Sequence, residues 1–343
     1  MRPSHLLPAA AALSHALLTI GHLPLLTINI AGLPALLQSN AIPGSKAANT
    51  AYLGTLLSAS PYAVIHLQED FNYHAALYST TAASFPHRTP TSGGVPFGSG
   101  LNTLSRLPFH QLQRTKWSSC SSASGADCLT PKGFTFTRLM LASTGSEAAY
   151  LDLYNLHTDA GSLPADLAAR QANMAQVLAH IDGWSAGNAV VVAGDTNSRY
   201  SREADAGLRG FLGAGFRDAW VEVERGGVVP GVGEESLCEN PSGTGWCETV
   251  DKVLVRGGGV VGVGVEGFGD ELWVEAEVCQ GQKDGRTRIF YLRAGTSAGR
   301  SLATGTKTAD CAVLVAPDGW QIAGFMGQHG DEVDQLALVY VPQ

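Results

Sequence analysis

Charged residues and long apolar runs are both scarce in this chain. Asp, Glu, Lys and Arg make up 15% of its 343 residues, against roughly 25% in an average soluble protein. Beyond the N-terminus no stretch of about 18 consecutive apolar residues occurs, so we expect no transmembrane segment. The 30 acidic residues outnumber the 22 basic ones, for a formal net charge of −8. That charge repels a polyanion unless a divalent cation intervenes, which weighs against nucleic acid as a partner without excluding it.

Metal-binding cysteine motifs are also missing. None of the six cysteines lies in a Cys-x-x-Cys motif, which argues against a zinc centre or a thioredoxin-type site. They fall instead into three local couples: Cys120 with Cys128, Cys238 with Cys247, and Cys279 with Cys311. Six cysteines allow many connectivities, so this disulfide pairing is a hypothesis from proximity. Disulfides are typical of exported proteins, and we therefore expect a secreted, extracellular protein.

The N-terminal residues 1–22 are predicted to be a signal peptide or leader. A basic residue precedes an apolar run there, which is the pattern of a secretory signal; a frayed apolar leader is the alternative. The chain is longer than one hydrophobic core usually organises, so we expect two domains. Strands alternating with a few helices fill 23–256, a Gly-rich linker covers 257–268, and an all-β pattern follows over 269–343.

One long helix is predicted in the first domain, from near Ser162 to Ile181. Residues on one face recur at helical spacing: Leu167, Gln171, Met174, Leu178 and Ile181. Pro164 near the start and Gly183 just past the end are typical of helix boundaries. We interpret this stripe as part of a hydrophobic core.

Polar side chains occur where several predicted strands end. Asp195 and Asn197 come directly behind the apolar run Ala-Val-Val-Val-Ala, and Glu69, His157 and Asn29 likewise follow apolar strands. Loops after strands often carry catalytic groups. Together these residues indicate a site that cleaves phosphoesters with the help of a metal ion.

Each of these groups suits one task in phosphoester hydrolysis. A hard cation such as Mg²⁺ prefers oxygen ligands and keeps several waters, so Glu69 is a candidate ligand with Asn29 in support. Imidazole titrates near neutral pH, so His157 can neutralise or protonate a phosphate oxygen. Asp195 can orient or deprotonate a water molecule, and Asn197 can donate to the developing oxyanion.

Each residue also has an ordinary structural interpretation when it is taken alone. Glu69 could be a solvated turn acid, and a lone histidine such as His157 is more often structural than catalytic. An Asp-x-Asn turn is common turn chemistry. Lys132, in a Thr-Pro-Lys-Gly segment, is a candidate phosphate contact, although an exposed lysine usually does nothing specific.

The joint pattern, in contrast, resembles a known family. Its segments appear in order within residues 24–255: Leu26–Pro34, Leu67–Phe71, Gly100–Arg106, Tyr154–Asp159, Gly194–Asn197 and Glu248–Lys252. The series is similar to the endonuclease/exonuclease/phosphatase superfamily, which includes DNase I-like nucleases, neutral sphingomyelinases and inositol phosphate phosphatases. The resemblance implies a DNase I-like, four-layer α/β/β/α sandwich. It further implies that Asn29 and Glu69 hold the metal. By the same resemblance His157 contacts the scissile phosphate, while Asp195 and Asn197 position the nucleophile and the oxyanion.

One motif of that family is missing. Asp251 matches an acid that, in the family, orients a final catalytic histidine in a later Ser-Asp-His motif. No Ser-Asp-His follows Asp251, and the one later histidine, His329, lies in a Gln-His-Gly segment of the second domain. Because such groups act as a unit, we expect a rate loss of several orders of magnitude.

The C-terminal residues resemble the second half of a jacalin-like lectin domain, as found in secreted fungal proteins of this superfamily. The matching segments include Gly319–Phe325 and Gly327–Leu336. The resemblance implies a partial β-prism in which Asp331, Glu332 and Asp334 hydrogen-bond a sugar diol. A charged surface β-turn is the alternative interpretation. One internal deletion near the Gly-rich linker would explain both this missing half and the missing histidine motif.

Two functional hypotheses follow. The first is a secreted phosphodiesterase or phosphatase that depends on Mg²⁺ or another divalent cation and carries a glycan-binding tail. It would act on a small phosphoester or a lipid headgroup, with activity impaired by the missing motif. The second is a catalytically inactive carbohydrate-binding protein that retains only the scaffold.

Overall fold

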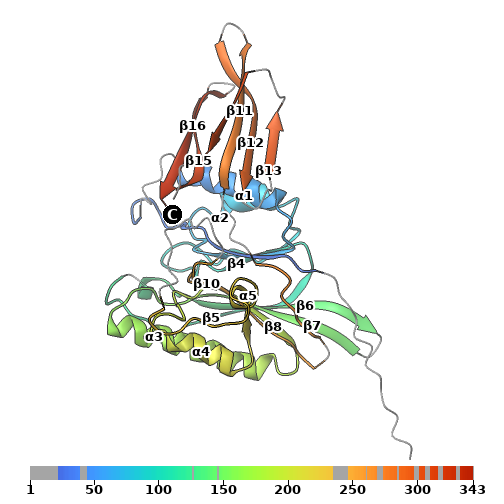
Figure 1. Cartoon of the computed structure of the whole chain (residues 1–343), viewed down its shortest axis with the longest axis vertical. Helices are drawn as coiled ribbons and strands as arrows, with labels where there is room; N and C mark the ends of the chain where they lie inside the picture. The colour runs from blue at the N-terminus through green and yellow to red at the C-terminus, as the bar shows by residue number, and fades with distance from the viewer. Residues whose placement is uncertain are drawn as a thin grey trace, which may run out of the picture.

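The computed structural model forms a layered α/β unit followed by a set of β-strands (Figure 1). It describes residues 22–38, 45–125, 127–144, 147–234, 246–259 and 261–268. Beyond these it describes the strand backbone over 273–283, 286–296, 301–305, 310–315, 320–329 and 333–342. The layered unit contains every residue that the sequence places in the phosphoester site.

The first sheet has four strands in the order β1-β2-β4-β3. They are β1 (Leu25–Asn29), β2 (Val64–Gln68), β3 (His87–Arg88) and β4 (Asn102–Ser105). Two helices, α1 (Lys46–Ala59) and α2 (His74–Thr81), cover its outer face (Figure 1). Leu57 of α1, Leu77 of α2 and Ile65 of β2 are buried in one apolar cluster, which fixes these helices on the sheet.

The second sheet has six strands in the order β5-β6-β7-β8-β10-β9. They are β5 (Phe109–Lys116), β6 (Gly133–Thr144), β7 (Glu147–His157), β8 (Ala189–Asp195), β9 (Arg217–Asp218) and β10 (Asp251–Arg256). The helices on its outer side are α3 (Pro164–Trp184), α4 (Ala206–Gly213) and α5 (Ala219–Val223). The two sheets stack between the two helix layers (Figure 1). The predicted four-layer α/β/β/α sandwich is therefore confirmed.

Strand β8 is buried on both faces along its whole length. Val190 and Val192 pack in the cluster that includes α3 and α4, whereas Ala189 and Val191 pack in the cluster that includes Val64 of the first sheet. A strand covered on both sides takes a continuous apolar run instead of an alternating one. This is the physical reason for the unbroken apolar segment in front of Asp195.

Helix α3 is longer than predicted and buries a different face. It includes Gly183, which was expected to lie beyond its end. Met174 and Ile181 are buried as predicted, whereas Gln171 is exposed. The buried face also carries three polar side chains: Asp166, Arg170 and Asn173. None of the described helices is both long and apolar enough to cross a membrane.

The Gly-rich stretch after β10 contributes apolar side chains to the sandwich. Val261, Val263 and Val265 pack against the cluster between the two sheets, while the glycines between them are exposed. Gly258 has to be glycine, since a Cβ there would lie 2.4 Å from the carbonyl carbon of Asn188. The valines thus form a strip on the sandwich, and the position of the domain boundary stays a prediction.

The C-terminal strands form an all-β unit, as predicted. They are β11 (Trp273–Lys283), β12 (Arg286–Thr296), β13 (Ser301–Gly305), β14 (Asp310–Val315), β15 (Trp320–His329) and β16 (Val333–Pro342). One sheet has the order β13-β12-β11-β14, and β15 pairs with β16. All the pairs are antiparallel. This is the all-β, jacalin-type architecture that the sequence indicates.

The disulfide prediction is confirmed for one couple. Cys120 and Cys128 are bonded, with their Cα atoms 5.5 Å apart. Cys247 also takes part in a disulfide, whereas its predicted partner Cys238 lies outside the described residues. Strands β11 and β14 place Cys279 directly opposite Cys311, a register in which a disulfide is geometrically possible. That third bond stays a prediction.

The buried His66 of β2 predicts how stability depends on pH. Burial lowers its pKa from 6.5 to about 4. Between about pH 6.5 and pH 4 the imidazole is protonated in the unfolded chain but not in the folded chain. The free energy of unfolding therefore decreases as the pH falls through this range. The expected loss is about 3 kcal/mol. Urea unfolding at a series of pH values should show this slope in the natural chain and a flatter one in His66→Leu. The exposed His110→Gln serves as control, and an unchanged slope in His66→Leu would refute the assignment.

Candidate phosphoester site

Five predicted side chains form one continuous series of contacts at an edge of the sandwich. Lys132 Nζ lies 3.2 Å from His157 Nε2, and the same His157 atom lies 3.5 Å from Asp195 Oδ2. Asn29 Nδ2 donates to Asp195 Oδ2 at 3.2 Å and to Glu69 Oε1 at 3.1 Å. Residues more than 160 positions apart in the sequence are therefore in direct contact.

The register of the strands creates this juxtaposition. In the first sheet β1 and β2 are parallel, with Asn29 beside Gln68, the residue before Glu69. In the second sheet β7 and β8 are parallel, with His157 beside Asp195. The carboxyl ends of two parallel strands lie at the same edge of their sheet. Because the two sheets are stacked, the edge that carries Asn29 and Glu69 lies next to the edge that carries His157 and Asp195. Strand β10 runs antiparallel to β8 and places Asp251 opposite Asp195.

Unusual backbone conformations are concentrated at this edge. Four non-glycine residues have a positive φ among those described, and three of them lie on site loops: Ala31 (48°), Glu69 (55°) and Asn197 (47°). Such residues cost about 1–3 kcal/mol each and persist where the surroundings hold them. Gly194 allows a further close approach, because a Cβ there would lie 2.1 Å from the carbonyl oxygen of Leu156. The site geometry is thus imposed by its surroundings.

The loop after β8 is held by hydrogen bonds from both sides. The Asn197 amide N–H donates to Asp195 Oδ1 at 3.0 Å, and its side-chain Nδ2 donates to the Thr158 carbonyl at 3.2 Å. Thr196 donates through its hydroxyl to the Val250 carbonyl at 2.6 Å. The Asp195–Asn197 turn is therefore tied to the loops after β7 and before β10.

His157 is buried and surrounded by charges of both signs. Burial lowers its pKa, and the ammonium of Lys132 lowers it further, whereas Asp195, Glu69 and Asp127 oppose this shift. The imidazole is consequently neutral at neutral pH. Its Nδ1 is buried without a hydrogen-bond partner among the described residues. A neutral ring can accept from Lys132 at Nε2, and it is ready to take up a proton when negative charge arrives.

A divalent cation fits this site through Glu69. Glu69 Oε1 accepts from Asn29, whereas Oε2 is buried and has no hydrogen-bond partner in the described part of the chain. A buried polar atom without a partner is costly, and Mg²⁺ needs only one or two carboxylates plus substrate phosphate. Asn29 Oδ1 accepts from the Ala31 N–H at 3.0 Å, so Asn29 also supports the loop. Within the described residues no cluster of three or more His, Cys, Asp and Glu residues could hold a metal.

Sequence reasoning missed several residues that support the site. Lys46 of α1 donates to the Ala31 carbonyl at 3.2 Å and to that of Leu33 at 2.8 Å, clamping the loop after Asn29. Asp127 forms an ion pair with Lys132. Trp117 Nε1 donates to the His157 carbonyl at 2.8 Å. Lys46 and Trp117 lie 13 or more positions from the groups they bond, whereas Asp127 lies just before Lys132. None of the three belongs to a sequence motif that marked it.

The acid that opens the last superfamily segment has a structural partner of its own. Glu248 is buried, accepts from the backbone of Tyr200 and from the Ser201 hydroxyl, and lies 3.3 Å from Lys252 Nζ. The buried pair Glu248–Lys252 thus anchors the chain between Asn197 and α4. This gives two residues of the motif a structural role.

The predicted sugar-binding residues fall at the last hairpin. Asp331 and Glu332 lie outside the described residues. Asp334 is the second residue of β16, one position after the Val333 that pairs with His329 of β15. Their role in sugar binding stays a prediction.

The four-layer sandwich, with its site residues gathered at one edge, identifies the chain as an α/β protein of this architecture. Comparison with known families identifies the family. The family model "Endonuclease/Exonuclease/phosphatase family 2" matches residues 37–213. The chain therefore belongs to the endonuclease/exonuclease/phosphatase family. The model of the jacalin-like lectin domain matches residues 243–339, so this domain follows the sandwich. That match begins before the predicted linker and overlaps β10.

Similar proteins include several sphingomyelinases. A "Sphingomyelinase" of Mycobacterium tuberculosis and one of Mycobacterium bovis are each 38% identical over 258 residues, covering 73% of this chain and 48% of theirs. The chain thus spans about half the length of the curated relatives it matches. The crystal structure of sphingomyelinase C from Streptomyces griseocarneus superposes with a TM-score of 0.51 at 18% identity, covering 83% of this chain and 99% of that one. This structural likeness supports the fold.

The contact between Lys132 and His157 predicts a change in titration. Replacing Lys132 by Met removes a positive charge 3.2 Å from the ring, while Asp195, Glu69 and Asp127 remain to favour the imidazolium. The pKa of His157 should therefore rise, which NMR titration of its ring proton would detect. Lys116→Met changes an exposed lysine on β5 and should leave the His157 titration unchanged. An equal effect of the two variants would contradict the proposed contact.

Proposed function

We propose that this chain is a secreted, divalent-cation-dependent phosphodiesterase that cleaves the headgroup of a phospholipid of the sphingomyelin class. The observation that carries the proposal is the unbroken series of contacts from Lys132 through His157, Asp195 and Asn29 to Glu69. The series contains a carboxylate that can bind a cation (Glu69), two side chains that can contact a phosphate (Lys132 and His157) and a carboxylate that can orient a water molecule (Asp195). The 38% identity to curated sphingomyelinases supports the lipid class.

Each side chain has one task in this mechanism. Glu69, with Asn29, would hold a cation that acts as a Lewis acid on the phosphate. Lys132 and the neutral His157 face the negative charge that develops on the phosphate oxygens. Asp195 orients a water molecule and accepts its proton. Asn197 is already fixed beside Asp195, which reduces the entropy lost when substrate binds.

The absent Ser-Asp-His motif reduces the expected rate. Asp251 lies opposite Asp195 across the β8–β10 pair, the position from which it would orient a histidine on a following segment. No such histidine follows it in the sequence before His329. We therefore infer an enzyme that is slow because the leaving oxygen lacks its proton donor.

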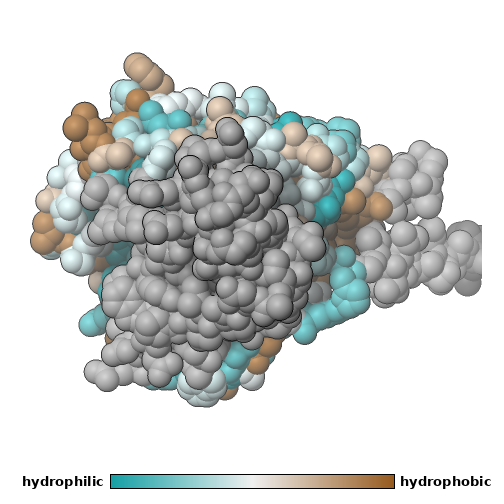
Figure 2. Space-filling view, turned by 90° about the horizontal axis from the view of Figure 1, so that it is seen from above, coloured by the Kyte–Doolittle hydropathy of each residue, from teal (hydrophilic) through white to brown (hydrophobic). Residues whose placement is uncertain are grey.

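Exposed apolar side chains beside the site favour a substrate held in a lipid surface. Leu36, on the loop after Asn29, is 96% exposed, Phe97 is 84% exposed and Leu129 is 63% exposed. The loop with Leu36 hydrogen-bonds Tyr73 through Ala35 N, and the loop with Phe97 hydrogen-bonds Asn72 through Val95 N. Both loops thus rest on the segment behind Glu69. Hydrophobic groups interrupt the hydrophilic surface in Figure 2.

Release of phosphocholine from sphingomyelin vesicles tests this function. We expect slow release with Mg²⁺, none with a chelator, and a loss of about a thousandfold in Asp195→Ala, because the water loses its base. Asp182→Ala, which removes an exposed acid of α3, should behave like the natural chain. Equal turnover in the natural chain and in Asp195→Ala would sink the proposal.

A second function, carbohydrate binding by the C-terminal strands, is favoured by the jacalin-like match. We infer that Asp334, together with Asp331 and Glu332, hydrogen-bonds sugar hydroxyls. A glycan array should show binding that Asp334→Ala abolishes and that Asp310→Ala, at the start of β14, retains. Binding that survives Asp334→Ala would place the sugar elsewhere. Glycan binding without Mg²⁺-dependent turnover would favour the inactive, lectin-like alternative.

A further inference from the structure

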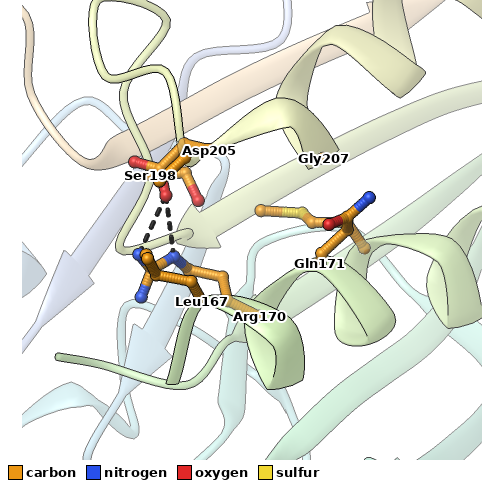
Figure 3. Close-up of a pocket in the computed structure, with 8 residues that line it drawn as sticks. Leu167, Arg170, Gln171, Ser198, Asp205 and Gly207 are labelled. Carbon is orange, nitrogen blue, oxygen red and sulfur yellow. Dashed lines mark hydrogen bonds and ion pairs between the residues drawn. The ribbon is translucent and has the colours of Figure 1, made fainter. Parts of the chain in front are cut away.

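A single buried guanidinium connects the two loops that carry the central site residues. Arg170 of α3 is 2% exposed. Its Nη1 donates to the carbonyl oxygens of Asp159 at 3.0 Å and Gly161 at 2.9 Å, both on the loop after His157. Its other nitrogens, Nε and Nη2, donate to Asp205 Oδ1 at 3.1 and 2.8 Å. Figure 3 draws Arg170 and Asp205, with the two bonds between them dashed.

Asp205 also bonds the loop after Asp195. It precedes α4 but makes no side-chain cap for that helix. Its second oxygen, Oδ2, accepts instead from the Arg199 backbone N–H at 2.9 Å and from Arg202 Nε. Arg202 in turn donates through Nη2 to the Asn197 carbonyl. One carboxylate thus joins Arg170, two further arginines and, through them, Asn197.

The left-handed backbone of Asn197 is held on several sides. Its φ of 47° is a conformation that asparagine tolerates better than most side-chain-bearing residues, but it is still sparsely populated. Its N–H is held by Asp195 and its side chain by Thr158. Its main-chain carbonyl accepts from Arg202. Replacing Arg202 would remove the bond to this carbonyl.

We propose that Arg170, Asp205 and Arg202 are positioning residues that lock the loop after β8 against the loop after β7, and so hold Asn197 and His157 in register. The catalytic part of the inference rests on the proposed phosphodiesterase function. The structural part, the locking of two loops, stands independently of it.

The six-stranded sheet contains a comparable arginine–aspartate pair that does not contact these loops. Arg138 of β6 makes a two-pronged ion pair with the buried Asp152 of β7, at 2.6 and 2.8 Å. Asp152 lies beside Val190, near the start of β8, whereas His157 lies beside Asp195 at its end. Arg138 also donates to the Trp184 carbonyl at 3.0 Å. The two pairs share their chemistry, but Arg170–Asp205 bonds the loops at the site, whereas Arg138–Asp152 lies far from them along β7.

Hydrogen–deuterium exchange of the full chain tests the locking without relying on activity. In Arg170→Lys, which keeps the charge but loses the planar fork, amide exchange should rise at least roughly tenfold in both segments 158–161 and 196–200. In Arg202→Ala, which leaves the Arg170–Asp205 pair intact, it should rise in 196–200 alone. In Arg138→Lys both segments should exchange as in the natural chain. Arg202 is partly exposed, so that variant keeps the test valid if Arg170→Lys fails to fold.

Turnover adds a second readout. Displacing a site group by about 1 Å costs about a hundredfold in rate, so both variants should lower kcat on sphingomyelin with little change in KM, while Arg138→Lys keeps kcat. Unchanged exchange in a folded Arg170→Lys and in Arg202→Ala would overturn the proposal, as would equal opening of both segments in Arg138→Lys. If the natural chain shows no turnover, the proposed function fails, and the exchange data still decide the locking.

Discussion

Burial of strand β8 on both faces is the constraint on which the site depends. All seven of its residues are buried, between the α3 and α4 layer on one side and the first sheet on the other. A slip of one residue in its register against β7 would exchange the side chains that pack on the helices with those that pack on the first sheet. That register sets Asp195 beside His157. The chemistry at the end of the strand is therefore fixed by the packing along its length.

The sequence predicted the strand ends well, because hydrophobic runs and the polar residues behind them are local signals. Asn29, Glu69, His157 and Asp195 were expected together for that reason, and they do lie together. The partners that hold them were not foreseen. Lys46 bonds carbonyl oxygens 13 and 15 positions before it, and Asp127 pairs with the nearby Lys132. Nothing in the sequence around either residue distinguishes it from an ordinary surface charge.

Helix α3 shows why periodicity alone misjudged one buried face. The pattern assigned Gln171 to the core, yet Gln171 is exposed and Arg170 is buried. Helical periodicity detects only apolar side chains, whereas Arg170 is buried because its guanidinium donates hydrogen bonds to loop carbonyl oxygens. A charge is tolerated inside because it is paired and bonded on all sides. The buried pairs Arg138–Asp152 and Glu248–Lys252 follow the same rule.

The strip of valines after β10 has a mechanical consequence. Val261, Val263 and Val265 lie on the cluster between the two sheets, and Arg217 donates to the Val263 carbonyl. The segment after β10 is therefore packed along the sandwich over these three residues and does not leave it as a flexible linker. A pull on the segment after residue 268 would load these three side chains one after another before it reached β10. The sandwich is thereby insulated from tension that its C-terminal neighbour transmits.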